Sequence, residues 1–216
     1  MPFPPFLTAA SGLGGSGPPS RGAVPSLPGL KLSLSVQKQL QSNWCWAAVA
    51  TSVALFYRST SAWTQCRVAS ATLGRIDCCG PAASDPLGCN QPYFLDMALI
   101  TTGHFAAMQA ARLTGPQVSA EVSGQRPIGC RIEWTDGSGH FLTIVGIQTM
   151  ASGTTYIDVS DPIYLDARIA FQAFPSLYQS GARWTHSYLT HSSALTAAAG
   201  GAVPRGQPHY PDVIGA

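Results

Sequence analysis

The sequence predicts an α+β protein in which a helical half is followed by an antiparallel β-sheet half. Two observations predict this class: apolar residues recur at helical spacing early in the chain, and they alternate with polar residues later. Apolar residues make up 45% of the 216 residues, which is enough to bury one sizeable core. We predict one domain at residues 31–191, with a flexible Pro- and Gly-rich tail or propeptide at 1–30 and a disordered tail at 192–216.

Two helices are predicted in the helical half. Ser42 can cap the first helix, whose buried stripe follows the spacing i, i+4, i+7 and i+8. The residues of this stripe are Val49, Val53, Phe56 and Tyr57. A second helix is predicted to begin at Pro92, which suits a first helical position, and to stop at Gly103, which suits the position after the last turn.

Alternating apolar residues predict strands downstream of Pro127. Ile128, Cys130, Ile132 and Trp134 would share one face of the first strand. A turn at 135–139 then leads into a strand at 140–147, so these two strands form a hairpin. Further strands are predicted at 156–160, 168–171 and 187–190.

The charge pattern limits the partners of this chain. Charged residues make up 10% of the sequence, and the formal net charge is +2. No dense run of Lys and Arg can neutralise phosphates, so we expect neither nucleic acid nor a membrane as partner. The longest uncharged apolar stretch, 44–57, is shorter than the roughly 20 residues needed to cross a bilayer. We expect a monomer, although no amphipathic heptad or self-complementary surface in the sequence bears on the oligomeric state.

Three residues of different types fall where thiol-based catalysis needs them. Cys45 lies in the first turn of the first predicted helix, where unpaired backbone N–H groups and the helix dipole favour a thiolate. His140 enters a strand directly after a Gly-Ser-Gly turn, which leaves its imidazole free to act as a base. Asp161 ends the next strand, which returns beside His140 in an antiparallel pair and can orient the imidazole.

The oxyanion of a tetrahedral intermediate needs fixed hydrogen-bond donors. One donor can be the backbone N–H of Cys45. A second can be the side-chain amide of Gln39, and Gln37 and Gln41 compete with it for this role. The sequence therefore predicts a catalytic set of Cys45, His140, Asp161 and Gln39.

These residues carry a resemblance to a known family. The order Gln39, Trp44-Cys45-Trp46-Ala, Gly-Ser-Gly-His140-Phe and Asp161-Pro162 resembles the papain-like cysteine peptidase superfamily over about residues 36–190. Shorter pieces around Cys66 and around Cys78-Cys79-Gly resemble bacterial members, including effector-type peptidases that plant pathogens deliver into host cells.

The resemblance implies the papain fold, with the active site in the cleft between the two halves. It implies a thiol protease that hydrolyses a protein or peptide substrate without a cofactor. Cys45 would be the nucleophile, His140 the base, Asp161 the orienting residue in place of papain's Asn, and Gln39 a donor to the oxyanion. His140 follows Cys45 by 95 residues rather than by roughly 130 to 150, which implies a minimal version of the fold.

Four cysteines lie in a cluster apart from the predicted site: Cys66, Cys78, Cys79 and Cys89. They could form two disulfides or a four-cysteine zinc site, but the paired Cys-x-x-Cys knuckles of zinc are absent. The Cα atoms of neighbours Cys78 and Cys79 are only ~3.8 Å apart, below the usual disulfide span of about 4.4 to 6.8 Å. Two of three pairings remain. We favour disulfides, which point to function outside the cytosol.

The start of the chain bears on the route of export. The first thirty residues lack the basic start and the continuous apolar region of a secretory signal peptide. We expect a protein that is secreted or delivered outside the producing cell, without a clear signal peptide. The disulfide interpretation and the effector-type resemblance both support this expectation.

Some residues allow more than one role. Asp158 is a rival to Asp161, but it lies inside its strand rather than at the end. Trp184 could shield the contact between His140 and Asp161 or simply fill the core, and we favour the core. Cys130 is expected in the core as well. The remaining histidines are expected at the surface or in packing roles: His104, His186, His191 and His209.

The same catalytic residues allow functions besides hydrolysis. An acyl transferase would use an amine instead of water to intercept the acyl-enzyme. A binding module could keep the fold and lose the activity. Hydrolysis of peptide bonds is the function that we favour.

Overall fold

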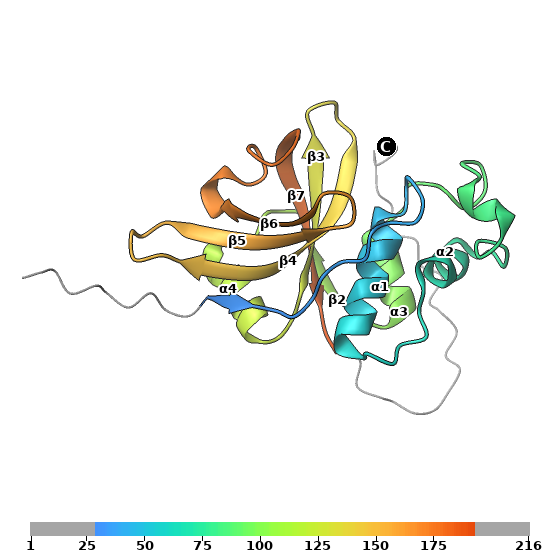
Figure 1. Ribbon diagram of the computed structural model, residues 1–216, viewed down its shortest axis with the longest axis horizontal. Coiled ribbons are helices and arrows are strands. Elements are labelled where there is room, and N and C mark those ends of the chain that lie inside the picture. Colours follow the sequence, from blue (N-terminus) through green and yellow to red (C-terminus); the bar gives the residue numbers. More distant parts are fainter. Residues whose placement is uncertain (1–28, 193–216) are drawn as a thin grey trace, which may run out of the picture.

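The computed structural model describes residues 29–192, in which the helices between residues 45 and 102 gather at one side of an antiparallel sheet and the helix at 115–123 lies apart from them, against the sheet (Figure 1). The order of strands across the sheet is β2-β7-β3-β4-β5-β6, and β1 pairs with β4 outside this path. All pairings are antiparallel. The predicted α+β class is confirmed. The tails predicted at 1–30 and 192–216 fall almost wholly outside the described residues.

The helices correct the sequence-based predictions in part. Their bounds are α1 Cys45–Tyr57, α2 Gln65–Leu73, α3 Leu95–Thr102 and α4 Gly115–Ser123, with short 3-10 turns at Pro81–Ser84 and Phe171–Ala173. Helix α3 begins at Leu95 rather than Pro92, but it ends as predicted, with Gly103 at φ 81°. Ser42 does not cap α1: the cap position is Trp44, and no side chain caps it.

Helices α2 and α4 were not predicted, although both carry local signals. Thr64 caps α2, and Gly74 ends it in the left-handed region at φ 66°. Thr114 and Gln117 form a reciprocal capping box at the start of α4. A Ser or Thr followed three residues later by Glu or Gln is a recognised helix-start pattern, so this signal was present in the sequence.

The strands follow the predicted alternation more closely. Their bounds are β1 Leu30–Lys31, β2 Phe105–Gln109, β3 Ile128–Trp134, β4 Gly139–Thr149, β5 Thr155–Asp161, β6 Leu165–Ala170 and β7 Gly181–Thr190. The predicted hairpin is the pair β3 and β4, in which Ile132 lies opposite His140. Strands β1 and β2 were not predicted.

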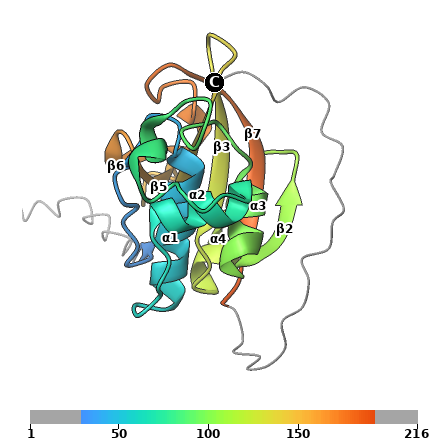
Figure 2. The same cartoon turned by 90° about the vertical axis from the view of Figure 1, so that its right-hand side faces the viewer.

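Helix α1 forms the centre of the helical half and contacts α2, α3 and strand β4 (Figure 2). Its residues from Trp46 to Ala54 are all buried. Small side chains at Ala47, Ala48 and Ala50 let neighbouring elements approach closely, and burying apolar surface stabilises this packing. Helix α1 is thereby fixed against β4, an inner strand of the sheet.

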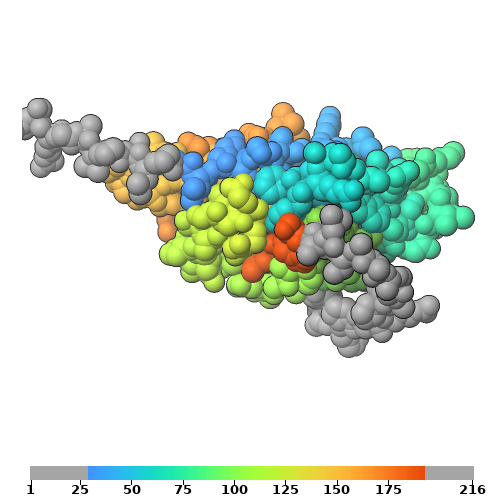
Figure 3. All heavy atoms as spheres, turned by 90° about the horizontal axis from the view of Figure 1, so that it is seen from below, coloured from blue at the N-terminus to red at the C-terminus, as the bar shows by residue number. Residues whose placement is uncertain are grey.

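Seen from below, β1 and the segment after it lie beside α4 on the surface (Figure 3), and the two elements contact each other. Among residues 29–192, no helix combines the length and the hydropathy that crossing a bilayer requires.

Candidate active site

A cavity of about 190 Å³ lies between the helical half and the sheet half. The helical half contributes Ser42, Asn43, Cys45, Trp46, Pro92 and Tyr93 to its lining. The sheet half contributes Trp134, Ser138, Gly139, His140, Phe141 and Ile163. The cavity therefore holds a thiol from one half and an imidazole from the other.

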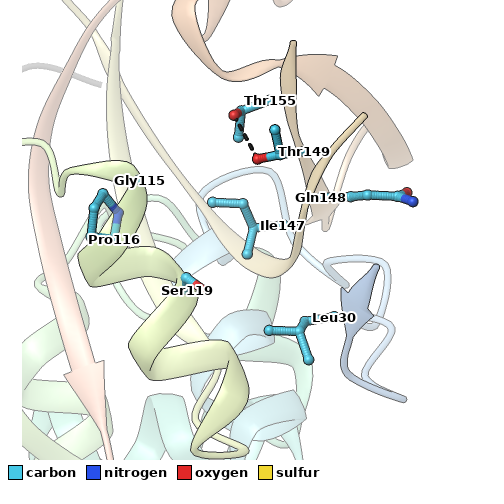
Figure 4. Close-up of a pocket in the computed structure, with 8 residues that line it drawn as sticks. All are labelled: Leu30, Gly115, Pro116, Ser119, Ile147, Gln148, Thr149 and Thr155. Carbon is cyan, nitrogen blue, oxygen red and sulfur yellow. Dashed lines mark hydrogen bonds between the residues drawn. The ribbon is translucent and has the colours of Figure 1, made fainter. Parts of the chain in front are cut away.

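A larger cavity of about 320 Å³ lies elsewhere, between α4, β1 and the β4–β5 hairpin (Figure 4). Its lining consists of Leu30, Gly115, Pro116, Ser119, Ile147, Gln148, Thr149 and Thr155. The hydroxyls of Thr149 and Thr155 bond to each other, and no lining residue has an ionisable side chain. This cavity has hydroxyls but no ionisable side chain that could activate them as a base, so the smaller cavity is the candidate active site.

Cys45 is the first residue of α1, and its half-buried thiol is not part of a disulfide. The first backbone N–H groups of a helix have no partner within the helix, and no side chain caps α1. The unpaired N–H groups and the helix dipole favour negative charge at this end. The position suits a thiolate and an oxyanion that forms next to it.

The segment that carries Cys45 is held by residues Cys89–Gln91, which we call the clamp strip. The indole N–H of Trp44 donates to the carbonyl oxygen of Cys89 at 2.7 Å, and that of Trp46 donates to the carbonyl of Gln91 at 3.0 Å. Both tryptophans are fully buried. Cys45 therefore lies between two side chains that are anchored on the same strip.

Asn90 provides further bonds from the clamp strip. Its side-chain oxygen accepts from the backbone N–H of Asn43, and its side-chain nitrogen donates to the hydroxyl of Ser42, both at 2.9 Å. The side chain of Asn43 donates in return to the carbonyl of Asn90. Ser42 therefore belongs to this network rather than to a helix cap.

Two disulfides tie the clamp strip to the helical half. Cys78 bonds to Cys89 at the start of the strip, and Cys66 on α2 bonds to Cys79. The predicted disulfides are confirmed, and the pairing avoids the disfavoured bond between neighbours. Asp77, Cys78 and Cys89 lie close together, but both thiols are consumed in disulfides and cannot ligate zinc as thiolates.

His140 is buried on β4 and lies between Asp161 and the cavity. Its Nε2 lies 2.9 Å from Oδ2 of Asp161, and Cys45 lines the same cavity from the helical half. The indole of Trp134 stacks on the imidazole, with ring centroids 5.4 Å apart and an interplanar angle of 18°. Tyr164 meets the imidazole edge-on. The ring is held in one plane between the thiol and the carboxylate.

Asp161 ends β5, and both of its oxygens are fully engaged. Oδ1 accepts from the backbone N–H groups of Ile163 and Tyr164, at 2.7 and 2.9 Å. Oδ2 accepts from His140 and from the hydroxyl of Tyr178, each at 2.9 Å. A buried carboxylate with this many donors stays ionised, because hydrogen bonds to the charged form favour it.

The contacts of His140 and Asp161 explain how the pKa of each residue is shifted. Burial lowers the pKa of His140, but the hydrogen bond to Asp161, the nearby Cys45 thiol and the negative charge of Asp161 raise it to about 9. Burial opposes ionisation of Asp161, but the His140 contact and the backbone donors hold the pKa of this carboxyl below its usual value. Near neutral pH the imidazole is therefore protonated and the carboxylate is charged.

Gln39 lies just before this site, but it does not line the cavity. Its amide nitrogen donates to the carbonyl oxygens of Gln41 and Ser42, at 2.9 and 2.6 Å. Its amide oxygen is buried and has no partner among the described residues. The rival Gln37 has another contact, since its side-chain oxygen accepts from Gln65.

Asp158 and Trp184 both have partners away from the His140 imidazole. Asp158 binds the guanidinium of Arg168 through both oxygens, at 2.8 and 2.9 Å, so its carboxylate is engaged away from His140. Trp184 packs against Phe171 and Phe174, as a core residue does. The indole that covers His140 is Trp134.

The remaining cysteine and histidines have structural surroundings. Cys130 is fully buried, and burial raises the pKa of its thiol well above the usual value. His104 is buried and stacks on Tyr57. His186 and His191 make local hydrogen bonds, and His209 lies outside the described residues.

Sequence reasoning missed three residues that contact the site. Trp134 was placed only on the apolar face of its strand. Its position beside His140 could have been inferred from the hairpin, which brings the two together. Asn90 and Tyr178 carried no signal, because they lie in segments without periodicity and reach the site only through the tertiary fold.

A free thiol and a buried imidazole–carboxylate pair, facing each other across a cleft between helices and an antiparallel sheet, define a papain-like cysteine protease. The family described as "Papain-like cysteine protease AvrRpt2" matches residues 28–179. The chain belongs to this family. The family resemblance and the enzyme class expected from the sequence are confirmed.

Two solved structures are similar to this chain at low identity. One is a double glycine motif protease from an AMS/PCAT transporter in complex with the leader peptide, with 18% identity, 74% of this chain and 93% of that chain covered, and a TM-score of 0.41. The other is the Pseudomonas avirulence protein AvrPphB, with 10% identity, 74% and 97% covered, and a TM-score of 0.31. No curated protein matches the chain.

Proposed function

We propose that this chain hydrolyses peptide bonds with Cys45 as nucleophile, His140 as general base and acid, and Asp161 as the residue that orients the imidazole. The observation that carries this proposal is the position of His140, which lines the same cavity as Cys45 and is hydrogen-bonded to Asp161. A nucleophile, a base within hydrogen-bond reach and a third group that orients the base are the parts that covalent catalysis requires.

The reaction starts from a thiolate and an imidazolium. The Cys45 sulfur attacks the carbonyl carbon of the scissile bond and forms a tetrahedral intermediate. His140 gives its proton to the leaving amine, the C–N bond breaks, and a thioester remains on Cys45. Neutral His140 then takes a proton from water, the hydroxide attacks the thioester, and the acid product leaves as thiolate and imidazolium return.

The negative oxygen of each tetrahedral intermediate needs donors. The backbone N–H of Cys45 at the uncapped start of α1 supports one such contact. We propose the amide of Gln39 as the second donor. Its nitrogen lies against the carbonyls of Gln41 and Ser42, and it would exchange one of these bonds for the oxyanion when substrate binds.

The substrate is a protein or peptide, as for a protease of this family. We propose a monomer that acts on a polypeptide without nucleic acid or membrane as partner, and the proposed chemistry uses only groups of the chain itself. We also propose delivery outside the producing cell. The two disulfides support this proposal, because disulfides persist in oxidising compartments.

The test is labelling with an epoxide inhibitor of thiol proteases together with cleavage of an unfolded protein, both read by mass spectrometry. We expect the native protein to cleave the substrate and to carry the label on Cys45. We expect the Cys45→Ala variant to do neither. Cys130 is the internal control, because a fully buried thiol should stay unlabelled.

Two different results would change the proposal. Labelling of Cys45 without release of hydrolysed product, but with transfer to an added amine, would establish an acyl transferase instead. A native protein with intact fold in which Cys45 takes no label would show that the thiol is not a reactive nucleophile.

A further inference from the structure

Tyr178 has a buried hydroxyl that points at the carboxylate of the proposed catalytic set. The residue is 4% exposed, and its hydroxyl donates to Oδ2 of Asp161 at 2.9 Å. The same oxygen accepts from His140 at the same distance. Hydrogen bonds thus connect His140 through Asp161 to Tyr178, and Cys45 lines the same cavity as His140.

The contacts of Asp161 explain what this hydroxyl adds. The two backbone donors both bind Oδ1. Without Tyr178, Oδ2 would accept from His140 alone and would attract its proton with the full charge of that oxygen. Tyr178 shares the charge on Oδ2. A hydrogen bond to a charged acceptor is worth more than one between neutral groups, so this contact lowers the pull that the carboxylate exerts on the proton of His140.

The segment that carries Tyr178 is held in place from outside the site. Arg112 donates to the carbonyl oxygens of Phe171 and Phe174, and its guanidinium lies over the ring of Phe171 at 4.1 Å. The ring of Phe174 packs on the ring of Tyr178, with centroids 5.7 Å apart. These contacts place the hydroxyl on Asp161 without using any residue of the cleft.

The ionisable groups near Tyr178 cannot substitute for it. Besides Asp161, its surroundings include Tyr164 from the β5–β6 turn and Cys130 from β3, and Arg112 faces Cys130. Burial first, and then the charge of Asp161, raise the pKa of Tyr178 far above its usual value. The phenol therefore stays protonated and remains a donor over the whole working range.

We propose that Tyr178 is a positioning residue for the reaction: its hydroxyl tunes the acidity of the His140 imidazolium through the shared oxygen of Asp161. This inference rests on the proposed function. When the hydroxyl is absent, Asp161 holds the proton of His140 more strongly, and the imidazolium becomes a poorer acid toward the leaving amine.

The test uses the full-length Tyr178→Phe variant, which keeps the ring and removes only the hydroxyl. We expect kcat to fall roughly tenfold, as it does for many groups that orient a catalytic residue. We also expect the alkaline limb of the profile of kcat/KM against pH to move up by about half a unit. Tyr156→Phe is the matched control, since Tyr156 lies on the same strand as Asp161 but far from it along the strand, and its profile should equal that of the wild type.

A second measurement does not need substrate turnover. The rate at which iodoacetamide alkylates Cys45 reports the thiolate–imidazolium pair, and its pH profile should shift in the same direction in Tyr178→Phe. A profile that coincides with the wild type, in a variant that unfolds at the same temperature, would overturn the proposal. If wild-type protein alkylates at Cys45 but cleaves nothing, the proposed function fails while the role of Tyr178 is still measured by alkylation.

Discussion

The side-chain oxygen of Asn90 lies 2.9 Å from the backbone nitrogen of Asn43 and accepts its hydrogen bond. Asn43 is two residues before Cys45, and Asn90 belongs to the clamp strip. The position of the thiol is therefore set by a polar contact between two segments that are distant in the sequence, in addition to the packing of α1.

Replacing Asn90 tests this contact. In Asn90→Ala, the backbone N–H of the half-buried Asn43 and the hydroxyl of the exposed Ser42 lose their partners, and a typical hydrogen bond contributes about 0.5 to 1.5 kcal/mol to stability. We expect stability to fall by that amount and kcat to fall about tenfold at a temperature where the variant is folded. The comparison is Ser42→Ala, which removes only one of the three bonds and should change kcat by less than about threefold.

The two disulfides should differ in their effect on the reaction. They close loops of similar length, with separations of 13 and 11 residues, so each should contribute about 2 to 4 kcal/mol to stability. Only the bond between Cys78 and Cys89 ends at the clamp strip. We expect Cys78→Ser/Cys89→Ser to lower both stability and kcat, and Cys66→Ser/Cys79→Ser to lower stability alone.

Thermal unfolding followed by steady-state kinetics on both double variants checks this expectation. The kinetics must be measured where both variants are folded. Equal kcat values in the two variants would contradict a special role of the clamp strip.

The charge on Asp161 should set the alkaline limit of activity. In Asp161→Asn, the imidazolium loses the negative charge that raises the pKa of His140 to about 9, so the alkaline limb should move to lower pH. We expect kcat/KM to fall about a hundredfold. The matched control is Asp158→Asn, which removes a carboxylate from the same strand that binds Arg168 instead. A pH profile of Asp161→Asn equal to that of the control would show that this charge does not act on His140.

The same pair should make stability depend on pH. The pKa of His140 is raised from 6.5 to about 9 in the folded protein, so its contribution is complete below about pH 6.5 and is lost as the pH rises through 9. The pKa of Asp161 is lowered from 3.8, so its contribution is present above about pH 4 and is lost on further acidification. The pair should stabilise most between these limits.

Urea unfolding of the wild type and of His140→Gln at several pH values measures this dependence. The difference in unfolding free energy should shrink by roughly 3 kcal/mol between pH 6 and pH 10, as an order of magnitude from the shift. A difference that stays constant over this range would show that His140 has the same affinity for protons in the folded and unfolded chain.

The sequence contained enough information to find the centre of the site but not its supports. Cys45, His140 and Asp161 each stand at the end of an element, where the periodicity of apolar residues starts or stops. Because strands β4 and β5 pair as neighbours, the proximity of His140 and Asp161 follows from the order of the strands. For Cys45, His140 and Asp161, the positions expected from the apolar pattern agree with the geometry of the site.

Asn90 and Tyr178 could not be predicted from the sequence for a common physical reason. Asn90 follows a loop that is shaped by disulfides rather than by periodicity, and Tyr178 follows a 3-10 turn at Phe171–Ala173. Their roles depend on contacts with residues 47 and 17 positions away. Trp134 was assigned to its face by strict alternation, but the pairing of β3 with β7 shifts after Glu133, and the indole lies over His140.

The thiol of Cys45 is synthesised well before the residues that complete its surroundings. His140, Asp161 and Tyr178 follow in that order, and the last of them lies just before strand β7, which pairs with β3 in the middle of the sheet. Sheets built from contacts distant in the sequence form late in folding. In a chain that is still emerging from the ribosome, the thiol of Cys45 is therefore present before the imidazole and the carboxylate that our proposal pairs with it.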